Sequence, residues 1–475
     1  MRTTEQYIEK LRSMRPNVYM GGELVKRDDP RFGPGLKTIG LTFDYVNKPD
    51  YEPLLTATSH LTGKKINRFC HIHQNPDDLL AKQEIVRLMC HKCGRCIQRC
   101  MGVDALNGVS VVTKDADLQY GTNYHDRFLK FLHYFQENDL VACCAQTDIK
   151  GDRSLRPHQQ SDPDLYLRIV EKRDDGIIVR GAKAHITIAS YSDEIIAVPT
   201  RAMTPKDKDY AVSFSIPADT EGVKLVTVAH IQRPRKHLRA PFEDCGNAHS
   251  MVLFEDVFVP WERVFLCGET DQAGKLAALF ATFHRHSYTG CKPAYTDIIM
   301  GATALIAEYS GIGSVSHIRD KLSQLITVAE LVYGAGIAAA VKAEKRASGT
   351  MVPSPLFCNV GRYHAGVNIY HEYETLGDIG GGLSATLPRE EDFYNPDTAE
   401  LLNKYIKRKD GVSAENLHRA YRLIENLIVS APGAAAQVSG LHGGGSPIME
   451  KIAIASTYDM EAKKQIAKDL AGIVD

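Results

Sequence analysis

The order in which helix-type and strand-type segments follow one another constrains the fold of this chain most strongly. Residues 1–140 are rich in helix formers, and the clearest helical segments there are Asp77–Met101 and Tyr124–Asn138. Over residues 141–272, short β-prone runs such as Met251–Val259 alternate with turn residues. Apolar residues at helical spacing then return and continue to the end of the chain.

The C-terminal part predicts several long amphipathic helices. Three apolar faces stand out, with caps expected at Ser316 and Ser413 for the second and third. Their residues are Ile298, Ala302, Leu305, Ile306 and Tyr309; Leu322, Leu325, Ile326, Ala329 and Val332; and Leu417, Tyr421, Ile424, Leu427 and Ile428. The sequence thus predicts an α+β protein with an N-terminal helical domain (1–140), a β-domain (141–272) and a helical bundle (273–475).

Charge and hydropathy narrow the class of protein. The chain has 57 Lys and Arg against 58 Asp and Glu, without the basic stripe typical of nucleic-acid or membrane-surface proteins. It has no uninterrupted apolar run long enough for a transmembrane helix, and Met1–Arg15 lacks the apolar centre of a secretory signal. We therefore expect a cytoplasmic protein whose eleven cysteines are ligands or buried thiols rather than disulfides.

Four of these cysteines lie within eleven residues, at Cys90, Cys93, Cys96 and Cys100. The spacing C-x2-C-x2-C-x3-C is that of bacterial ferredoxins, although Met101 stands where their motif has proline. A ferredoxin arrangement needs an irregular loop, which Gly94 would permit. A continuous helix would instead place Cys96 and Cys100 on one face at i and i+4. A face of buried free thiols is the third interpretation, and the local pattern does not decide between them.

A second group of potential ligands follows much later, at His284 and Cys291. The two residues are seven positions apart and so share a helical face. A single histidine is more often structural than ligating, but this pair can complete a four-ligand site across two packed helices.

These two segments resemble the ligand stretches of the 4-hydroxybutyryl-CoA dehydratase/vinylacetyl-CoA Δ-isomerase family, which belongs to the same flavoprotein superfamily as 4-hydroxyphenylacetate 3-hydroxylase. The resemblance covers nearly the whole chain, and further matching segments are Gly121–His125, Thr147–Arg153, Asp164–Lys172, Arg180–His185, Asp207–Phe214, Leu376–Leu383 and His442–Pro447. It implies an acyl-CoA-dehydrogenase-like fold, FAD, and a [4Fe-4S] cluster held by three cysteines and one histidine. The matching ligand positions are Cys96, Cys100, His284 and Cys291.

The resemblance also assigns roles near the cluster. His284 is the candidate exchangeable ligand and base, while Tyr288 and Lys292 match family residues close to the substrate. Cys90 and Cys93 have no role in the family pattern, so they are either bystanders or competitors for the metal.

For the flavin, the absence of a G-x-G-x-x-G turn argues against a Rossmann site. The resemblance instead implies a flavin between the β-domain and the bundle. Asp148 and its polar neighbours are candidates for positioning it, Thr187 matches a family threonine beside the ring, and glycine runs permit close backbone approach. The predicted flavin contacts are Thr147, Lys150, Asp152, Arg153, Thr187, Gly381, Gly382, His442, Gly443 and Gly444.

The chain departs from the family at two candidate catalytic positions. Ser439 and His249 stand where the family carries acidic residues. Serine cannot replace a carboxylate as acid or base at neutral pH, and histidine replaces it only in part. Either His249, His286 or His442 takes over proton transfer, or the substrate differs.

The resemblance implies a radical dehydration of 4-hydroxybutyryl-CoA. Removing water from a 4-hydroxyacyl thioester breaks a C3–H bond that no carbonyl acidifies. One-electron exchange with a flavin would make that bond more acidic, and a cluster iron would act as a Lewis acid on the departing hydroxyl.

Three alternatives remain at this level. They are the same cofactor design acting on a different and perhaps non-CoA substrate, a flavin-dependent aromatic monooxygenase without a cluster, and a redox protein using Cys90–Cys100 as a ferredoxin-like site. The resemblance further implies a homotetramer whose neighbouring subunits complete the flavin site.

Overall fold

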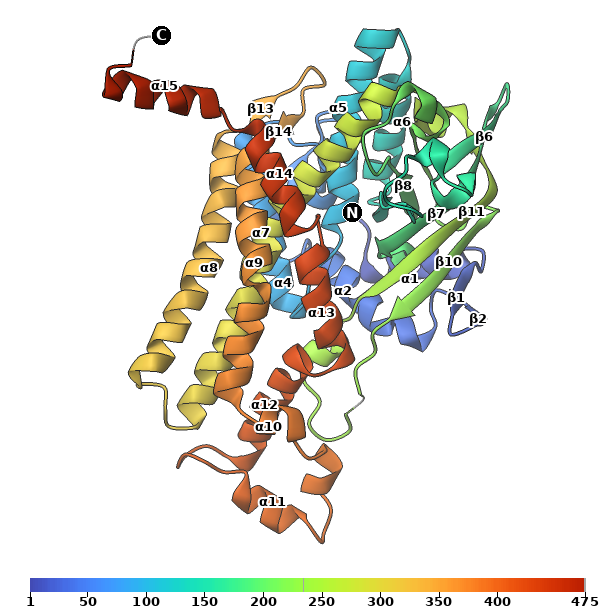
Figure 1. Cartoon of the computed structure of the whole chain (residues 1–475). Coiled ribbons are helices and arrows are strands. Elements are labelled where there is room, and N and C mark those ends of the chain that lie inside the picture. Colours follow the sequence, from blue (N-terminus) through green and yellow to red (C-terminus); the bar gives the residue numbers. More distant parts are fainter. Residues whose placement is uncertain (234, 474–475) are drawn as a thin grey trace.

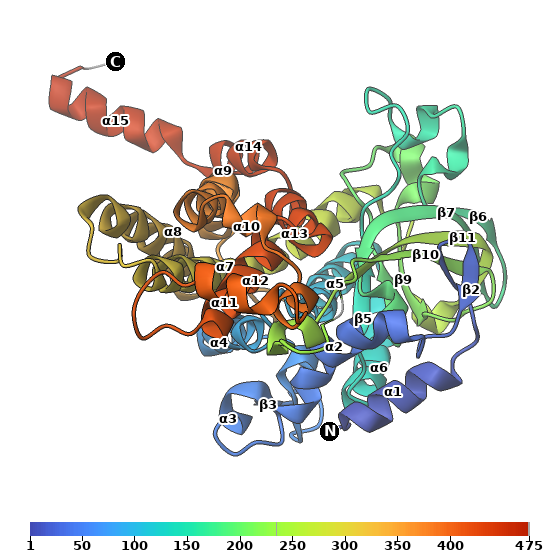
Figure 2. The same ribbon diagram turned by 90° about the horizontal axis from the view of Figure 1, so that it is seen from below.

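The structure, a computed structural model, describes residues 1–233 and 235–473. A bundle of long helices lies beside a part built around β-sheets, and the last helix projects away from the body (Figure 1). The view from below shows the same two parts side by side, with α5 between them (Figure 2). The α+β class is therefore confirmed.

Six helices form most of the N-terminal region: α1 (Thr4–Ser13), α2 (Gly33–Asp44), α3 (Glu52–Leu55), α4 (Pro76–Cys93), α5 (Cys100–Tyr120) and α6 (Tyr124–Glu137). The helix expected at Tyr124–Asn138 is confirmed by α6. The single helix expected over Asp77–Met101 is wrong. The chain leaves the helix at Gly94, whose φ is +66°, and a helix resumes only at Cys100.

The larger sheet has six strands, β2 (Glu23–Val25), β1 (Val18–Met20), β10 (Val223–Ala229), β11 (Ala248–Pro260), β7 (Gly176–Thr187) and β6 (Arg168–Lys172), in this order. The smaller sheet has four, β12 (Val264–Cys267), β9 (Val212–Pro217), β8 (Glu194–Ala197) and β5 (Ala142–Ala145). β1 pairs with β10 in parallel, so Val18 lies opposite Leu225. The N-terminal region thus contributes β1 and β2 to the sheet. The interpretation of this region as helices and loops missed them, because a strand of three residues is too short to show the alternation of apolar and polar residues. We keep the boundaries near residues 140 and 272 as a proposal.

Three long helices make the bundle: α7 (Thr270–Tyr309), α8 (Ser316–Val341) and α9 (Pro355–Gly380). The remaining helices are α10 (Leu383–Thr386), α11 (Ala399–Tyr405), α12 (Ala414–Ile428), α13 (Ala431–His442), α14 (Pro447–Thr457) and α15 (Met460–Ala471). There are also two short hairpins, β3 (Thr56–Thr58) with β4 (Lys65–Asn67) and β13 (Glu344–Lys345) with β14 (Met351–Val352).

All three expected amphipathic helices are present. The cap at Ser413 is confirmed, since its side chain accepts a hydrogen bond from Asn416 N, whereas Ser316 is already inside α8 and Val315 occupies the cap position.

α8 is the one described helix long and apolar enough to cross a membrane, with a mean hydropathy of 1.6 over its most apolar window. It packs against both α7 and α9, as a helix of a protein bundle does. Length and composition alone are therefore weak evidence for a membrane span.

α7 joins the two halves of the molecule because it packs on α4 and α5 as well as on α8 and α9. Its close approach to α4 requires glycine at Gly290, where an added Cβ would lie 2.4 Å from the carbonyl oxygen of Gln83. This contact brings the segment His284–Lys292 against the helix that carries Cys90 and Cys93.

Candidate functional site

The clustered cysteines lie around a break between two helices. Cys90 and Cys93 belong to the last turn of α4, Cys96 lies in the loop, and Cys100 is the first residue of α5. The loop needs positive φ at Gly94 and also at Gln98, where φ is 62°. An irregular loop at Cys96 is therefore present, and Cys96 and Cys100 do not share a continuous helical face.

Two arginines hold this loop in place. Arg95 Nε donates to the carbonyl oxygen of Cys245 at 3.0 Å, and Arg99 Nη2 donates to Asp139 Oδ1 at 2.6 Å. Both side chains are buried, so the loop is fixed from inside the protein rather than by solvent-exposed contacts.

The four predicted cluster ligands converge. The ligand atoms of Cys100, His284 and Asp104 all lie within 4.8 Å of one another. Cys96 is within hydrogen-bonding reach of Cys291, so the loop and α7 meet through these thiols. The four donors come from two distant segments of the sequence, since Cys100 and Cys291 are 191 positions apart.

The electrostatics of the group favour one thiolate at Cys96. The neighbouring thiols of Cys291 and Cys90 can donate to this sulfur, which holds the pKa of Cys96 well below its usual range. Burial raises the pKa of Cys100, whose sulfur has no comparable donor thiol. Because thiolates rather than thiols bind metals, Cys96 is the sulfur best prepared to ligate.

The two cysteines without a role in the family pattern have different surroundings. Cys90 belongs to the same apolar cluster as Cys100, against which Cys291 packs, and it lies near Cys96. Cys93 instead donates from Sγ to the carbonyl oxygen of Arg95 at 3.0 Å and packs against Cys245. Cys90 is therefore placed to compete for the metal. The sulfur of Cys93 faces Arg95 and Cys245 instead. All eleven cysteines, each within the described part of the chain, are free.

The predicted substrate residues of α7 are buried in one polar group. Lys292 Nζ lies 2.5 Å from Glu372 Oε2, which also accepts from Thr296 Oγ1 at 3.0 Å. Tyr288 donates its hydroxyl to the carbonyl oxygen of Gly440 at 2.5 Å, and burial raises the pKa of this phenol. Glu372 carried no sequence signal, because only the fold brings α9 beside Lys292.

The turn between α13 and α14 forms a wall against this group. An added Cβ at Gly444 would lie 3.5 Å from the His284 ring, and one at Gly443 would lie 3.5 Å from the Tyr288 ring. Arg362 holds the turn by donating to several of its carbonyl oxygens, including that of Gly443 at 2.7 Å. The predicted residues Ser439 and His442 belong to the same segment, and both are exposed in the single chain.

His249 and Thr187 approach from the large sheet. Thr187 Oγ1 lies 3.1 Å from His249 Nδ1, and the two residues face each other across β7 and β11. Burial lowers the pKa of His249 to about 4, so its imidazole is neutral at pH 7. A negative charge at Cys96 acts on the pKa of His249 in the opposite direction, but burial is the larger effect. His286, another candidate, is fully buried and directs Nε2 to the carbonyl oxygen of Gly336.

The other predicted flavin residues do not meet in one chain. Thr147, Lys150, Asp152 and Arg153 follow β5, where Asp152 accepts from Ser154 in an exposed turn. Neighbouring Asp148 is buried and paired with Lys183 at 2.8 Å.

Gly381 and Gly382 follow the far end of α9. At about 1.5 Å per residue, Gly380 lies roughly 27 Å along α9 from Arg362, which contacts the other glycine run. The two predicted glycine runs therefore cannot contact the same flavin ring within one subunit.

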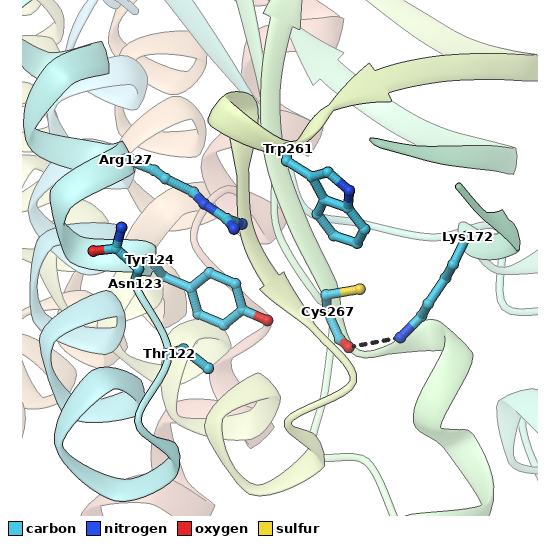
Figure 3. A pocket seen from close by; sticks show the side chains of 7 residues that line it. All are labelled: Thr122, Asn123, Tyr124, Arg127, Lys172, Trp261 and Cys267. Carbon is cyan, nitrogen blue, oxygen red and sulfur yellow. Dashed lines mark hydrogen bonds between the residues drawn. The ribbon is translucent and has the colours of Figure 1, made fainter. Parts of the chain in front are cut away.

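A surface cavity of about 370 Å³ lies elsewhere, between α6 and the end of the smaller sheet (Figure 3). Its lining is Thr122, Asn123, Tyr124, Arg127, Lys172, Trp261 and Cys267. Lys172 Nζ donates to the carbonyl oxygen of Cys267 at 3.2 Å, and Arg127 stacks near the Trp261 ring. None of the predicted ligands lines this cavity, so it is separate from the thiol group.

Family models match almost the whole chain. The model described as 4-hydroxyphenylacetate 3-hydroxylase N terminal matches residues 3–266, and the C-terminal model of the same description matches residues 273–472.

Two individual proteins match this chain over almost their whole length. The 4-hydroxybutyryl-CoA dehydratase/vinylacetyl-CoA-Δ-isomerase of Clostridium aminobutyricum is 41% identical, over 99% of each chain. The oxygenase component of 4-hydroxyphenylacetate 3-monooxygenase of Thermus thermophilus is 27% identical, over 98% of this chain and 96% of that one.

Solved structures agree. An oxygen-tolerant archaeal 4-hydroxybutyryl-CoA dehydratase from N. maritimus superposes with a TM-score of 0.95 at 37% identity, covering 100% of this chain and 95% of the other. The oxygenase component of 4-hydroxyphenylacetate 3-monooxygenase complexed with FAD gives a TM-score of 0.88 at 24% identity, over 99% and 98% of the two chains, and shares the fold.

Proposed function

Because the chain belongs to the 4-hydroxybutyryl-CoA dehydratase/vinylacetyl-CoA Δ-isomerase family, within the wider 4-hydroxyphenylacetate 3-hydroxylase group, we propose that it dehydrates a 4-hydroxyacyl-CoA. The reaction is of the 4-hydroxybutyryl-CoA to crotonyl-CoA type and uses FAD and a [4Fe-4S] cluster. Δ-Isomerisation of the matching enoyl-CoA is the accompanying activity.

The observation that carries this proposal is the meeting of Cys96, Cys100, Cys291 and His284. Three sulfurs and one imidazole come together where two helices and a loop meet, with Cys100 and His284 buried and Cys96 and Cys291 half-buried, and they make a donor set suited to an iron–sulfur cluster. We propose these four residues as the ligands. When bound, the cluster supplies a Lewis acid and the flavin supplies one-electron chemistry.

The chain's own residues would orient and protonate the substrate around this centre. Lys292 offers a buried cation next to Cys291, and Tyr288 offers a hydroxyl. The Arg362 guanidinium lies over the Tyr288 ring, 4.4 Å from its centre. His284 is the proposed base, since its side chain lies between the thiols and the glycine turn. Exclusion of water by this buried wall strengthens each of these polar interactions.

A flavin site next to the sheet is part of the proposal. The FAD-bound relative has the same fold, and Thr187 lies beside His249 on the large sheet. The remaining contacts proposed for the flavin are Thr147, Lys150, Asp152, Arg153, Gly381, Gly382, His442, Gly443 and Gly444.

Assembly into a homotetramer, which the family resemblance implies, is also part of the proposal. The two glycine runs are far apart in one chain, so a second subunit must supply one of them if both contact a flavin. α15 has no buried residue and exposes Ile466 and Leu470, as expected of a helix that packs on another subunit (Figure 1).

A second candidate substrate is favoured by one observation. Ser439 is exposed and His249 is a neutral imidazole, so neither position supplies the carboxylate that the family pattern has there. The same cofactor design acting on a different acyl compound is therefore the alternative.

Turnover separates these functions. Anaerobically purified protein is incubated with 4-hydroxybutyryl-CoA, and crotonyl-CoA formation is followed by its absorbance and by chromatography. Crotonyl-CoA supports the proposal, while bound iron and flavin without product point to a different substrate. Hydroxylation of 4-hydroxyphenylacetate with reduced flavin and oxygen, in protein that contains no iron, would establish the monooxygenase instead.

A further inference from the structure

The His284 ring has a carboxylate partner that neither the family resemblance nor the sequence pattern assigned. Nδ1 of His284 lies 3.1 Å from Asp104 Oδ2. Asp104 is on α5, one helical turn after Cys100, and its side chain is fully buried. Resting on the proposed function, we propose that Asp104 is the positioning residue that fixes which nitrogen of His284 faces the thiols.

The contact determines the tautomer of the histidine. A carboxylate accepts hydrogen bonds and cannot donate them, so the hydrogen in this contact is on Nδ1 of His284. The lone pair is then on Nε2, which is the form a metal ligand needs. A carboxylate behind a ligating histidine also orients the ring.

Asp104 is itself held on both oxygens. Oδ1 accepts from Lys82 Nζ at 2.9 Å, and Ser287 Oγ lies 2.9 Å from each of the two oxygens. Lys82 also donates to the carbonyl oxygen of Phe283 at 3.0 Å, so the network ties α4 and α5 to α7. With these partners in place, Asp104 acts through His284 rather than as a ligand of its own.

The remaining surfaces of the ring are packed. Phe280 stacks on His284 with ring centres 5.6 Å apart and planes 4° from parallel, and Gly444 closes over Cδ2. This packing fixes the plane of the ring but does not distinguish its two nitrogens. That distinction comes from Asp104.

The test uses the anaerobically purified holoenzyme and compares wild type with Asp104→Asn. Two properties are measured: the histidine nitrogen coupling in the electron–nuclear double-resonance spectrum of the reduced cluster, and the rate at which a chelator removes iron. The substitution should change or abolish the coupling and speed iron loss about 10-fold or more, the range known for partners of metal-bound histidines.

Glu194→Gln is the matched control. Glu194 is a buried carboxylate between Arg263 Nη1 and Ser215 Oγ, each at 3.0 Å, on the smaller sheet. Its substitution perturbs a similar buried polar group without touching His284. It should leave the histidine coupling and the rate of iron loss unchanged.

The outcomes are separable. Wild type without iron overturns the proposed function, whereas iron-loaded Asp104→Asn with wild-type coupling and wild-type iron loss overturns the role of Asp104 alone. If Asp104→Asn does not fold, Asp104→Glu decides, because it keeps the charge but displaces the carboxylate relative to Nδ1 of His284 by one methylene. An altered coupling in Asp104→Glu supports the proposal, and an unchanged one overturns it.

Discussion

Lys292 and Glu372 form an ion pair in the protein interior, with 2.5 Å between Nζ and Oε2, although 80 residues separate them in sequence. The pair links α7 to α9 immediately beside the candidate ligand Cys291. Within the described part of the chain, the second carboxylate oxygen of Glu372 has no hydrogen-bond partner. The cation at Lys292 therefore depends on this carboxylate for its charge balance.

Glu372→Gln should damage both stability and activity. The substitution leaves a buried ammonium without a counter-charge, which costs about 3 kcal/mol or more when one partner of such a pair is removed. We expect a lower denaturation midpoint and at least about a 10-fold fall in kcat, equivalent to about 1.4 kcal/mol. Thr296→Val is the control, since it removes a neutral hydroxyl that contacts the same oxygen and the carbonyl oxygen of Lys292, and it should cost about 1 kcal/mol. Equal effects of the two substitutions would show that the charge has no special role.

Gly290→Ala should separate α4 from α7. The added Cβ would lie 2.4 Å from the backbone oxygen of Gln83, a contact that requires the helices to move. We expect a loss of about 2 kcal/mol or more in unfolding free energy and a parallel loss of bound iron. Gly301→Ala, at a position on α7 with open space around it, should be neutral or slightly stabilising. Wild-type iron content in Gly290→Ala would contradict the close approach as the basis of the site.

Acid should destabilise the C-terminal helices through His418. This side chain is fully buried on α12, and burial lowers its pKa to about 4 from 6.5. Because the folded state keeps the neutral ring, its contribution is complete above pH 6.5 and is lost as the pH falls from 6.5 to 4. The loss is at most about 3 kcal/mol. Urea midpoints of wild type and His418→Gln, measured across this range, should differ in slope, and parallel curves would contradict the assignment.

Leu470→Glu should weaken the proposed assembly. Leu470 is 85% exposed on α15, a helix with no contact that buries it in the single chain. Charge at this position should not unfold the subunit but should shift the sedimentation coefficient toward smaller species. Lys464→Glu, on the same helix at a charged position, is the control. Identical sedimentation of wild type and Leu470→Glu would place the interface elsewhere.

Much of the fold follows from sequence periodicity, but the ends of elements do not. The apolar face from Leu417 to Ile428 predicted α12 because it repeats every 3.6 residues over about three turns. The break at Gly94 was left open between a continuous helix and an irregular loop, because one glycine is compatible with either a helix or a turn. The short strand β1 was missed because it is defined by its partner Leu225, not by its own pattern.

In the candidate site, too, some residues could be predicted from the sequence and others depend on partners that only the fold supplies. The four ligand positions were predicted from their residue types and from the family resemblance, and they converge in the structure, but their binding of a cluster remains a prediction. The roles of Asp104 and Glu372 could not be predicted from the sequence. Each depends on a partner on another helix, His284 for Asp104 and Lys292 for Glu372, and only the fold brings these partners together. The acyl-CoA-dehydrogenase-like label and the flavin contacts likewise remain predictions.

The most direct measurement of the central claim is the number of iron and sulfide atoms per chain after anaerobic purification, for wild type, Cys100→Ser and Cys93→Ser. We predict about four of each in wild type, a near-complete loss in Cys100→Ser, and wild-type content in Cys93→Ser, whose sulfur faces Arg95 and Cys245. A flavoprotein without iron, or loss of iron in Cys93→Ser with retention in Cys100→Ser, would contradict a cluster held by Cys96, Cys100, His284 and Cys291.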